Sequence, residues 1–259
     1  MKLLFIGDIV ASCGRNMLAK NIDQIRNSFH IDMVIVNGEN AAHGRGLTFN
    51  IAEELFEVGA DVITTGNHVW NNKEIYSILE CNPNVLRPAN LPESNPGKGV
   101  VIYELGNRKV GVINLMGRTF MEANNCPFEA ADRAIAQLRQ QTNVIFVDFH
   151  AEATSEKMAL GWYLDGRVSA VVGTHTHIQT ADEKILPQGT AYLTDAGMTG
   201  AYYSVLGMER KIIIERFRTH LPQRFELADG AAQLNGVVVD IDDESGHALE
   251  IQRINLTDF

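Results

Sequence analysis

Short apolar runs recur along the whole chain and predict buried strands. Each run is rich in valine, isoleucine, leucine or phenylalanine and is bounded by turn-forming or charged residues, which is typical of strands covered on both faces. The runs occupy residues 3–6, 33–36, 62–65, 100–103, 110–114, 144–149, 168–172, 191–194, 237–241 and 248–254. The last two bracket the turn residues 242–246.

Apolar residues recur at helical spacing between several of these runs. Strand–helix alternation of this kind predicts an α/β fold with largely parallel pairing in the first half of the chain. Pro127 suits the first turn of a helix, and the turn at Gly106-Asn107 predicts a hairpin and therefore a mixed sheet. The helical stripes are Met17, Leu18, Ile22 and Ile25; Ile51, Leu55 and Val58; and Ala130, Ala131, Ala134, Ile135 and Leu138.

The chain length and the lack of internal repeats or linkers predict a single domain over residues 1–259. One segment, residues 199–225, shows no strand pattern. Its paired tyrosines, Tyr202 and Tyr203, and its basic run fit a lid over a site or a contact between subunits, and the sequence leaves both open.

Polar side chains follow five of the predicted strands, at the point where each strand ends. In open α/β sheets, sites form just beyond the carboxyl ends of strands. Glycine precedes four of the polar positions, and glycine there permits a sharp turn and a close backbone approach. The polar residues are Asp8, Glu39 with Asn40, Asn67 with His68, His150, and His175 with His177; the glycines are Gly7, Gly38, Gly66 and Gly173.

The donor atoms of this set indicate a transition-metal centre. Two carboxylates, two amides and three imidazoles without sulfur suit Mn, Fe, Zn or Co better than Ca or Cu(I). A carboxylate can bridge two ions, and ions ~3.5–4 Å apart can clamp a phosphate group. We therefore predict a two-metal site that acts on a phosphoester.

Each of these residues also has an ordinary structural explanation. Asp8 could cap a helix beginning near Gly14, Asn40 and Asn67 could be turn residues, and His150 could be a core histidine. His175 and His177 are harder to explain in this way, because alternation in an extended segment would place both on one side. The joint occurrence at five strand ends favours the metal site. Three other histidines, His30, His220 and His247, are expected on the surface, and His43 is left undecided between loop and substrate contact.

Composition and charge limit the partners. Hydrophobic residues make up 45% and charged residues 21%, as in ordinary globular proteins, and no stretch approaches the length of a membrane span. The formal net charge of −10 disfavours stable binding of RNA or DNA. Cys13, Cys81 and Cys126 lack any paired spacing, which indicates reduced thiols. The N-terminal apolar run is interrupted by Asp8, so we expect a cytoplasmic protein rather than a secreted one.

The ordered blocks Gly7-Asp8, Gly38-Glu39-Asn40, Gly66-Asn67-His68, His150 and Gly173-Thr174-His175-Thr176-His177 resemble those of the calcineurin-like metallophosphoesterases. Two departures matter. Asp8 is followed by Ile9 and Val10 where that superfamily usually has Asp-x-His, and Glu39 with Asn40 stands where it usually has a bridging aspartate. Both departures resemble the YmdB-like branch, bacterial phosphodiesterases of cyclic nucleotides, and the similarity extends along nearly the whole chain.

The resemblance implies a four-layer αββα sandwich with mixed sheets. It also implies two divalent or mixed-valence transition-metal ions per chain, with Fe or Mn expected. Carried over by position, Glu39 bridges both ions, and His68 stays off the metals as the catalytic acid. One ion is completed by Asp8, Asn40 and His177, and the other by Asn67, His150 and His175.

The expected activity is hydrolysis of small phosphodiesters, above all of 2′,3′-cyclic nucleotides to nucleoside monophosphates. One alternative is a phosphomonoesterase, which the lack of a clear arginine clamp disfavours. Another is a metal-dependent nucleotide-binding regulator, which the presence of His68 disfavours. A nuclease is disfavoured by the acidic charge. Homo-oligomerisation is left open.

Overall fold

The computed structural model describes residues 1–259 and contains two stacked β-sheets. The first sheet has seven strands in the order β2-β11-β12-β1-β3-β4, with β13 paired to β12. β1 runs parallel to β3 and antiparallel to β12, so the sheet is mixed. Its strands are β1 (Lys2–Ile6), β2 (Asp8–Ile9), β3 (Met33–Asn37), β4 (Val62–Thr64), β11 (Met198–Ala201), β12 (Ala232–Ile241) and β13 (Ala248–Thr257).

The second sheet has six strands in the order β5-β6-β7-β8-β10-β9. The four central strands are parallel, while β5 and β9 are antiparallel edges. The predicted hairpin at Gly106-Asn107 is confirmed, because it joins β5 to β6. The strands are β5 (Val100–Leu105), β6 (Arg108–Met116), β7 (Ile145–His150), β8 (Ala170–Thr174), β9 (Lys184–Ile185) and β10 (Ala191–Leu193).

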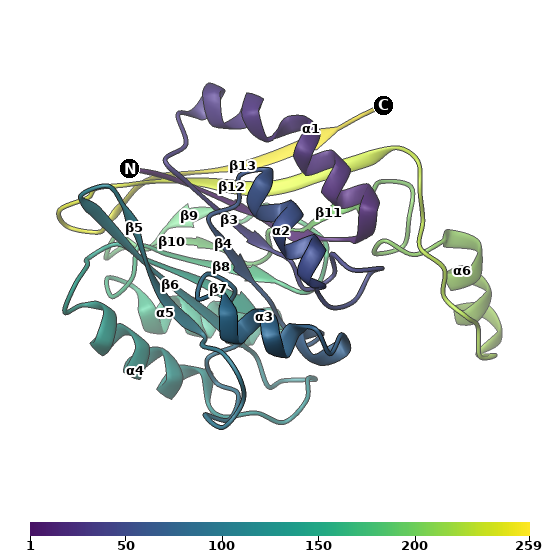
Figure 1. Ribbon diagram of the computed structural model, residues 1–259, viewed down its shortest axis with the longest axis horizontal. Coiled ribbons are helices and arrows are strands. Elements are labelled where there is room, and N and C mark those ends of the chain that lie inside the picture. Colours follow the sequence, from purple (N-terminus) through teal and green to yellow (C-terminus); the bar gives the residue numbers. More distant parts are fainter.

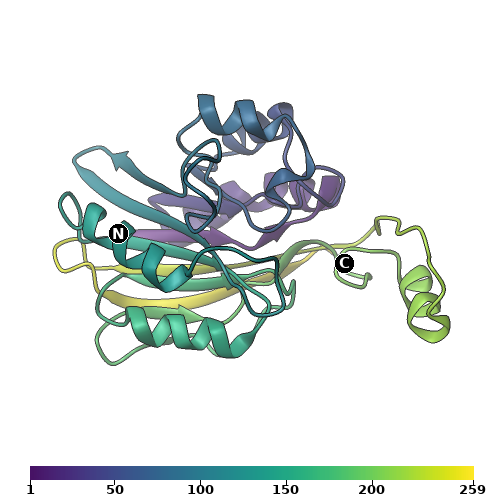
Figure 2. The ribbon, with the colours of Figure 1, turned by 90° about the horizontal axis from the view of Figure 1, so that it is seen from below.

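Helices cover the two outer faces of this pair of sheets, and Figure 2 shows the resulting layers edge-on. The first sheet is covered by α1 (Ala11–Phe29), α2 (Phe49–Glu57) and α3 (Ile75–Cys81), which follows the short 3-10 helix η1 (Val69–Asn71). The second is covered by α4 (Pro127–Leu138) and α5 (Thr154–Leu164). None of the helices combines the length and the apolar character of a membrane span.

The alternation of side chains along β1 shows how one strand serves two cores. Leu4 and Ile6 pack with the helices of the first sheet, whereas Leu3 and Phe5 face the second sheet. Phe5 meets Phe146 of β7 with ring centroids 5.0 Å apart. Because neighbouring strand residues point to opposite faces, a continuous apolar run serves both sides. The predicted αββα sandwich with mixed sheets is confirmed.

The helices were predicted less completely than the strands. The stripes led correctly to α1, α2 and α4, but α3, α5 and α6 (Arg210–Thr219) were not predicted. The α1 helix begins at Ala11 with Val10 as its N-cap. The alternative of Asp8 as a cap for a helix near Gly14 is therefore wrong.

The α6 helix stands away from the body of the molecule in both views (Figures 1 and 2). It lies within the segment 199–225 that the sequence left undecided. Only Ile213 of the helix is buried, while Phe217 is 75% exposed. Packing against the rest of the chain therefore holds this helix only weakly.

Candidate functional site

The predicted site residues gather at one edge of the sandwich, where the carboxyl ends of β3, β4, β7 and β8 meet. A cavity of about 570 Å³ opens there. One wall carries predicted site residues, and the other is formed by side chains of residues 205–225, the segment that includes α6. The cavity is lined by Glu39, Asn40, Gly44, Arg45, His68, Glu152, His175, Thr176, His177, Val205, Leu206, Met208, Ile213, Arg216, Phe217 and Phe225.

Four donor atoms converge on one small space at the base of this site. The Nε2 atom of His150 lies 2.8 Å from Oδ1 of Asn67, 3.0 Å from Nδ1 of His175 and 3.2 Å from Oε1 of Glu39. Donors bound about 2.0–2.1 Å from one ion lie roughly 3 Å apart. Glu39, His150 and His175 thus form a group that could hold a metal ion.

A second group lies beside the first and contains Asp8, Asn40 and His177. Nε2 of His177 and Oδ1 of Asp8 are 4.0 Å apart. The Oδ1 atoms of Asp8 and Asn40 are buried and have no hydrogen-bond partner. A buried unpaired polar atom is costly, and a bound cation would offset that cost. The residues therefore fit a metal ion here as well.

The two histidines of the first group are each held by an acceptor on the ring nitrogen that faces away from it. Nδ1 of His150 lies 2.9 Å from the Thr174 hydroxyl, and Nε2 of His175 lies 3.1 Å from Oε2 of Glu152. With a proton on each outer nitrogen, the inner nitrogens of both rings are the atoms that can offer lone pairs to a cation in the same space. That arrangement is common for metal-binding histidines, whose other nitrogen donates to a protein acceptor.

Burial and charge shift the pKa values of these groups strongly. Burial disfavours the charged form of His150, but Glu39, by charge and hydrogen bond, outweighs it and raises the pKa of His150 to about 9. Burial and then the charge of His150 lower the pKa of His175 to about 3, so its ring is neutral. Burial raises the pKa of Asp8, against the charges of His177 and His150. Such opposed shifts in one cavity are typical of functional sites.

Gly66 shows why glycine is required at one strand end. A Cβ atom at this position would collide with the ring of His150 and the carboxylate of Glu39. The predicted close approach of the backbone is therefore real at the turn after β4.

The backbone conformation of two segments differs from the extended conformation that the sequence predicted. Asn67 and His68 lie in a turn rather than an extended segment, with φ −90° and ψ 7° at His68. His175 and His177 are not in alternating extended backbone either, because their φ angles are 100° and 65°. Both histidines line the cavity, but a strained loop directs them there instead of strand alternation.

His68 lines the cavity without joining the first donor group. Its backbone N–H donates to Oε2 of Glu39 at 3.1 Å, which ties the two residues together. Its ring Nδ1 lies 3.3 Å from Oδ1 of Asn71. With Nδ1 turned toward this acceptor, Nε2 is the ring atom left for a ligand in the cavity.

The remaining histidines and the cysteines lie outside these groups. His30, His220 and His247 are exposed, as predicted, and His43 is exposed as well. The three cysteines form no disulfide and belong to no metal-binding group.

Several buried charged residues beside the site were missed from the sequence. Asp148 and the ion pair of Lys157 with Asp195 are fully buried next to the site. A charged residue inside an apolar run could have marked Asp148, but nothing local marks Lys157. Two arginines, Arg45 and Arg216, line the cavity, although the sequence had offered no clear arginine clamp.

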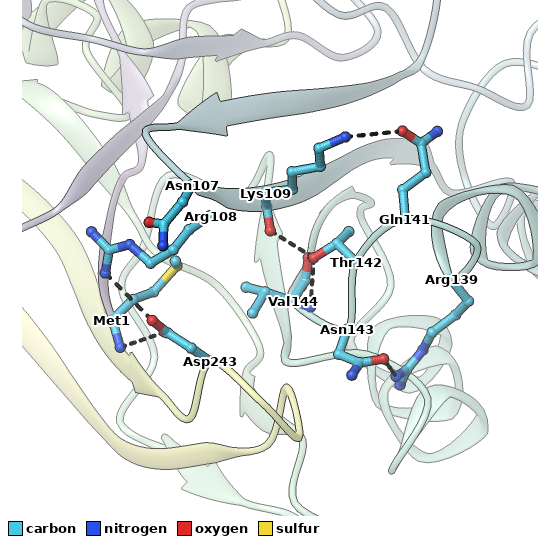
Figure 3. A pocket seen from close by; sticks show the side chains of 10 residues that line it. All are labelled: Met1, Asn107, Arg108, Lys109, Arg139, Gln141, Thr142, Asn143, Val144 and Asp243. Atoms are coloured by element: carbon cyan, nitrogen blue, oxygen red, sulfur yellow. Dashed lines mark hydrogen bonds and ion pairs between the residues drawn. The ribbon is translucent and has the colours of Figure 1, made fainter.

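A second hollow of about 500 Å³ lies elsewhere on the molecule and is lined by Arg108, Lys109 and Arg139 (Figure 3). Its cations already have partners within the protein. Arg108 binds Asp32 and Asp243, Lys109 approaches Gln141, and Arg139 donates to Asn143 and to a backbone carbonyl. None of the predicted site residues lines it, so it is not the predicted site.

Known proteins are similar to this chain in sequence and fold. The model of the family described as YmdB-like protein matches residues 4–254. A Bacillus subtilis protein named 2′,3′-cyclic-nucleotide 2′-phosphodiesterase is 54% identical over 100% of this chain and 98% of its own. The structure of a hypothetical protein from Thermus thermophilus is 43% identical, with a TM-score of 0.93 and 99% of both chains covered. A Mycoplasma pneumoniae structure titled a novel phosphatase is 35% identical, with a TM-score of 0.93, covering 99% of this chain and 93% of its own.

Proposed function

The chain belongs to the YmdB-like family, and from this premise we propose that it is a metal-dependent phosphodiesterase that hydrolyses 2′,3′-cyclic nucleotides to nucleoside monophosphates. The observation that carries the proposal is the convergence of donor atoms of Asn67, His175 and Glu39 at 2.8, 3.0 and 3.2 Å from Nε2 of His150. The name of the Bacillus subtilis relative supports the substrate class.

We propose two metal positions that share Glu39. Asn67, His150 and His175 would hold one ion, in line with the distances around Nε2 of His150. Asp8, Asn40 and His177 would hold the other, in line with the unpaired oxygens of Asp8 and Asn40. The ions supply, when bound, the positive charge that holds the phosphate and activates the attacking water.

His68 is the proposed general acid. The oxygen of water forms a bond to phosphorus and releases one proton to solvent, one phosphorus–ribose oxygen bond breaks, and the ring proton of His68 passes to the departing ribose oxygen. Uptake of a proton from solvent then restores His68. The contact of Nδ1 with Asn71 leaves Nε2 as the nitrogen that would face the leaving group. The backbone hydrogen bond to Glu39 ties His68 to a proposed metal ligand.

A phosphomonoesterase remains a second candidate because Arg45 and Arg216 line the same cavity. A guanidinium can bind the dianionic end of a monoester through two hydrogen bonds. Turnover of bis-p-nitrophenyl phosphate compared with p-nitrophenyl phosphate separates the candidates. Preference for the diester supports our proposal, and preference for the monoester contradicts it.

The direct test combines metal analysis with a panel of cyclic nucleotides. We expect about two transition-metal ions per chain, as two-metal hydrolysis requires, and nucleoside monophosphates as products. Full activity of metal-free protein in excess EDTA would contradict the proposal. The choice of Fe or Mn, the single domain over residues 1–259, the cytoplasmic location and the lack of stable nucleic-acid binding stay predictions.

A further inference from the structure

Asp148 is a fully buried carboxylate that no lysine or arginine neutralises. It lies on β7, two residues before His150, and faces the gap between the two sheets. Three donors satisfy it instead. Thr174 on β8 donates to Oδ1 at 2.7 Å, and Thr64 on β4 and Asn37 on β3 donate to Oδ2 at 2.5 and 3.0 Å. One side chain thus joins strands of both sheets at the edge that bears the site.

The link through Thr174 determines which nitrogen of His150 carries a proton. A hydroxyl has one hydrogen, and the Thr174 hydroxyl donates it to the carboxylate of Asp148. The same oxygen lies 2.9 Å from Nδ1 of His150 and can therefore only accept there. Nδ1 must therefore carry a proton, and Nε2 is the ring nitrogen that can give a lone pair to a metal ion in the space shared with Glu39 and His175.

The link through Asn37 reaches Glu39 on the other sheet. Asp148 accepts from the amide Nδ2 of Asn37, which fixes the orientation of that amide. The amide Oδ1 of Asn37 then accepts the backbone N–H of Glu39 at 3.2 Å. Asn37, like Asp148, is fully buried, so no water competes for these contacts.

We propose that Asp148 is a positioning residue that prepares His150 and Glu39 to bind metal, through Thr174 and Asn37. The inference rests on the proposed function, in which His150 and Glu39 are ligands. Residues that orient metal ligands in this way typically contribute ~10–100-fold to metal affinity. A carboxylate that only joined the sheets would contribute to stability and leave metal affinity unchanged.

The test measures Zn²⁺ affinity by competition with a chromophoric chelator, together with thermal stability. Thr174→Val removes the hydroxyl at nearly constant shape, and Thr174→Ser restores it. We expect Thr174→Val and Asp148→Asn to weaken Zn²⁺ binding roughly 10–100-fold and Thr174→Ser to bind within a few-fold of wild type. In the Zn²⁺-loaded wild type, proton NMR should show a slowly exchanging Nδ1–H of His150 that Thr174→Val loses.

Thr190→Val is the matched control. Thr190 is also fully buried, and its hydroxyl donates to the Val168 carbonyl and accepts from the Gly166 N–H, away from the site. It should lose stability without losing Zn²⁺ affinity. Equal Zn²⁺ affinity in wild type, Thr174→Val and Asp148→Asn would overturn the inference, as would an equal loss in the control. Failure of the wild type to bind Zn²⁺, Mn²⁺ or Fe²⁺ would instead overturn the proposed function.

Discussion

Lys157 and Asp195 form a buried ion pair, with 2.6 Å between Nζ and Oδ2 and both side chains 1% exposed. Lys157 also donates to the carbonyl of Thr174, and Asp195 accepts from the backbone and hydroxyl of Thr176. Through these hydrogen bonds the pair holds in place the loop that carries His175 and His177, whose backbone conformations are strained.

Lys157→Met should cost about 3–5 kcal/mol of unfolding free energy, because it leaves Asp195 buried and unpaired. The matched change is Arg253→Met. It breaks an ion pair of similar length, 2.7 Å to Glu183, but with a third of the arginine exposed, and should cost only about 0–1 kcal/mol. Denaturant unfolding of both variants measures the difference. Similar losses in the two variants would show that the buried pair has no special role.

Glu39→Gln should lower metal content and turnover more than Asn40→Ala. A bridging carboxylate neutralises two cations, whereas an amide offers one neutral oxygen. We expect more than ~100-fold loss of kcat for Glu39→Gln, beyond the range that changes outside the ligand set cause. Metal analysis beside kcat checks the prediction. Two ions per chain and wild-type turnover in Glu39→Gln would exclude Glu39 as the bridge.

His68→Ala should lower kcat while metal content stays nearly intact, because His68 stands outside the donor group around His150. A general acid contributes ~10²–10⁴-fold. The loss should shrink for bis-p-nitrophenyl phosphate, whose leaving group needs little protonation, compared with a cyclic nucleotide. Equal losses on both substrates together with metal release would show that His68 is a ligand.

Gly66→Ala should weaken metal binding, since the added methyl group would push His150 and Glu39 apart. Overpacking of this kind costs about 1–3 kcal/mol. Gly111→Ala is the control, because the three atoms nearest to its methyl group belong to the Leu138 side chain, on the outer side of the second sheet. Both variants should lose thermal stability, and only Gly66→Ala should lose Zn²⁺ affinity in a chelator competition. Loss of affinity in both would point to general destabilisation.

Removing metal should lower the melting temperature. Saturation at 100 times Kd stabilises the folded state by about 2.7 kcal/mol, which corresponds to roughly 5–10 °C for a chain of this size. Calorimetry with and without EDTA, followed by metal addition, measures the shift. Glu39→Gln should show a much smaller change, and a shift as large as that of wild type would argue against Glu39 as a ligand.

The sequence predicted best those site residues that are marked by their immediate neighbours in the chain. The strand ends at Asp8, Glu39 and His150 could be located because apolar runs stop there, and glycines marked the close approaches. Asp148 and Lys157 could not be assigned, because their partners are distant in sequence: 111 residues separate Asn37 from Asp148, and 38 separate Lys157 from Asp195. The strained conformation of the loop at His175 could not be predicted for a different reason. A backbone held by tertiary contacts leaves no periodic pattern in the sequence.

The proposed ligands come from strand ends of both sheets, so folding of both sheets has to precede assembly of the complete ligand set. Asp8 accepts a hydrogen bond from the backbone of His175, 167 residues away, and such distant pairings form late in folding. A chain with only one sheet formed holds an incomplete ligand set. With the proposed ligand set, metal uptake would follow closure of the sandwich, and on the ribosome the full centre could not assemble before His177 has been synthesised.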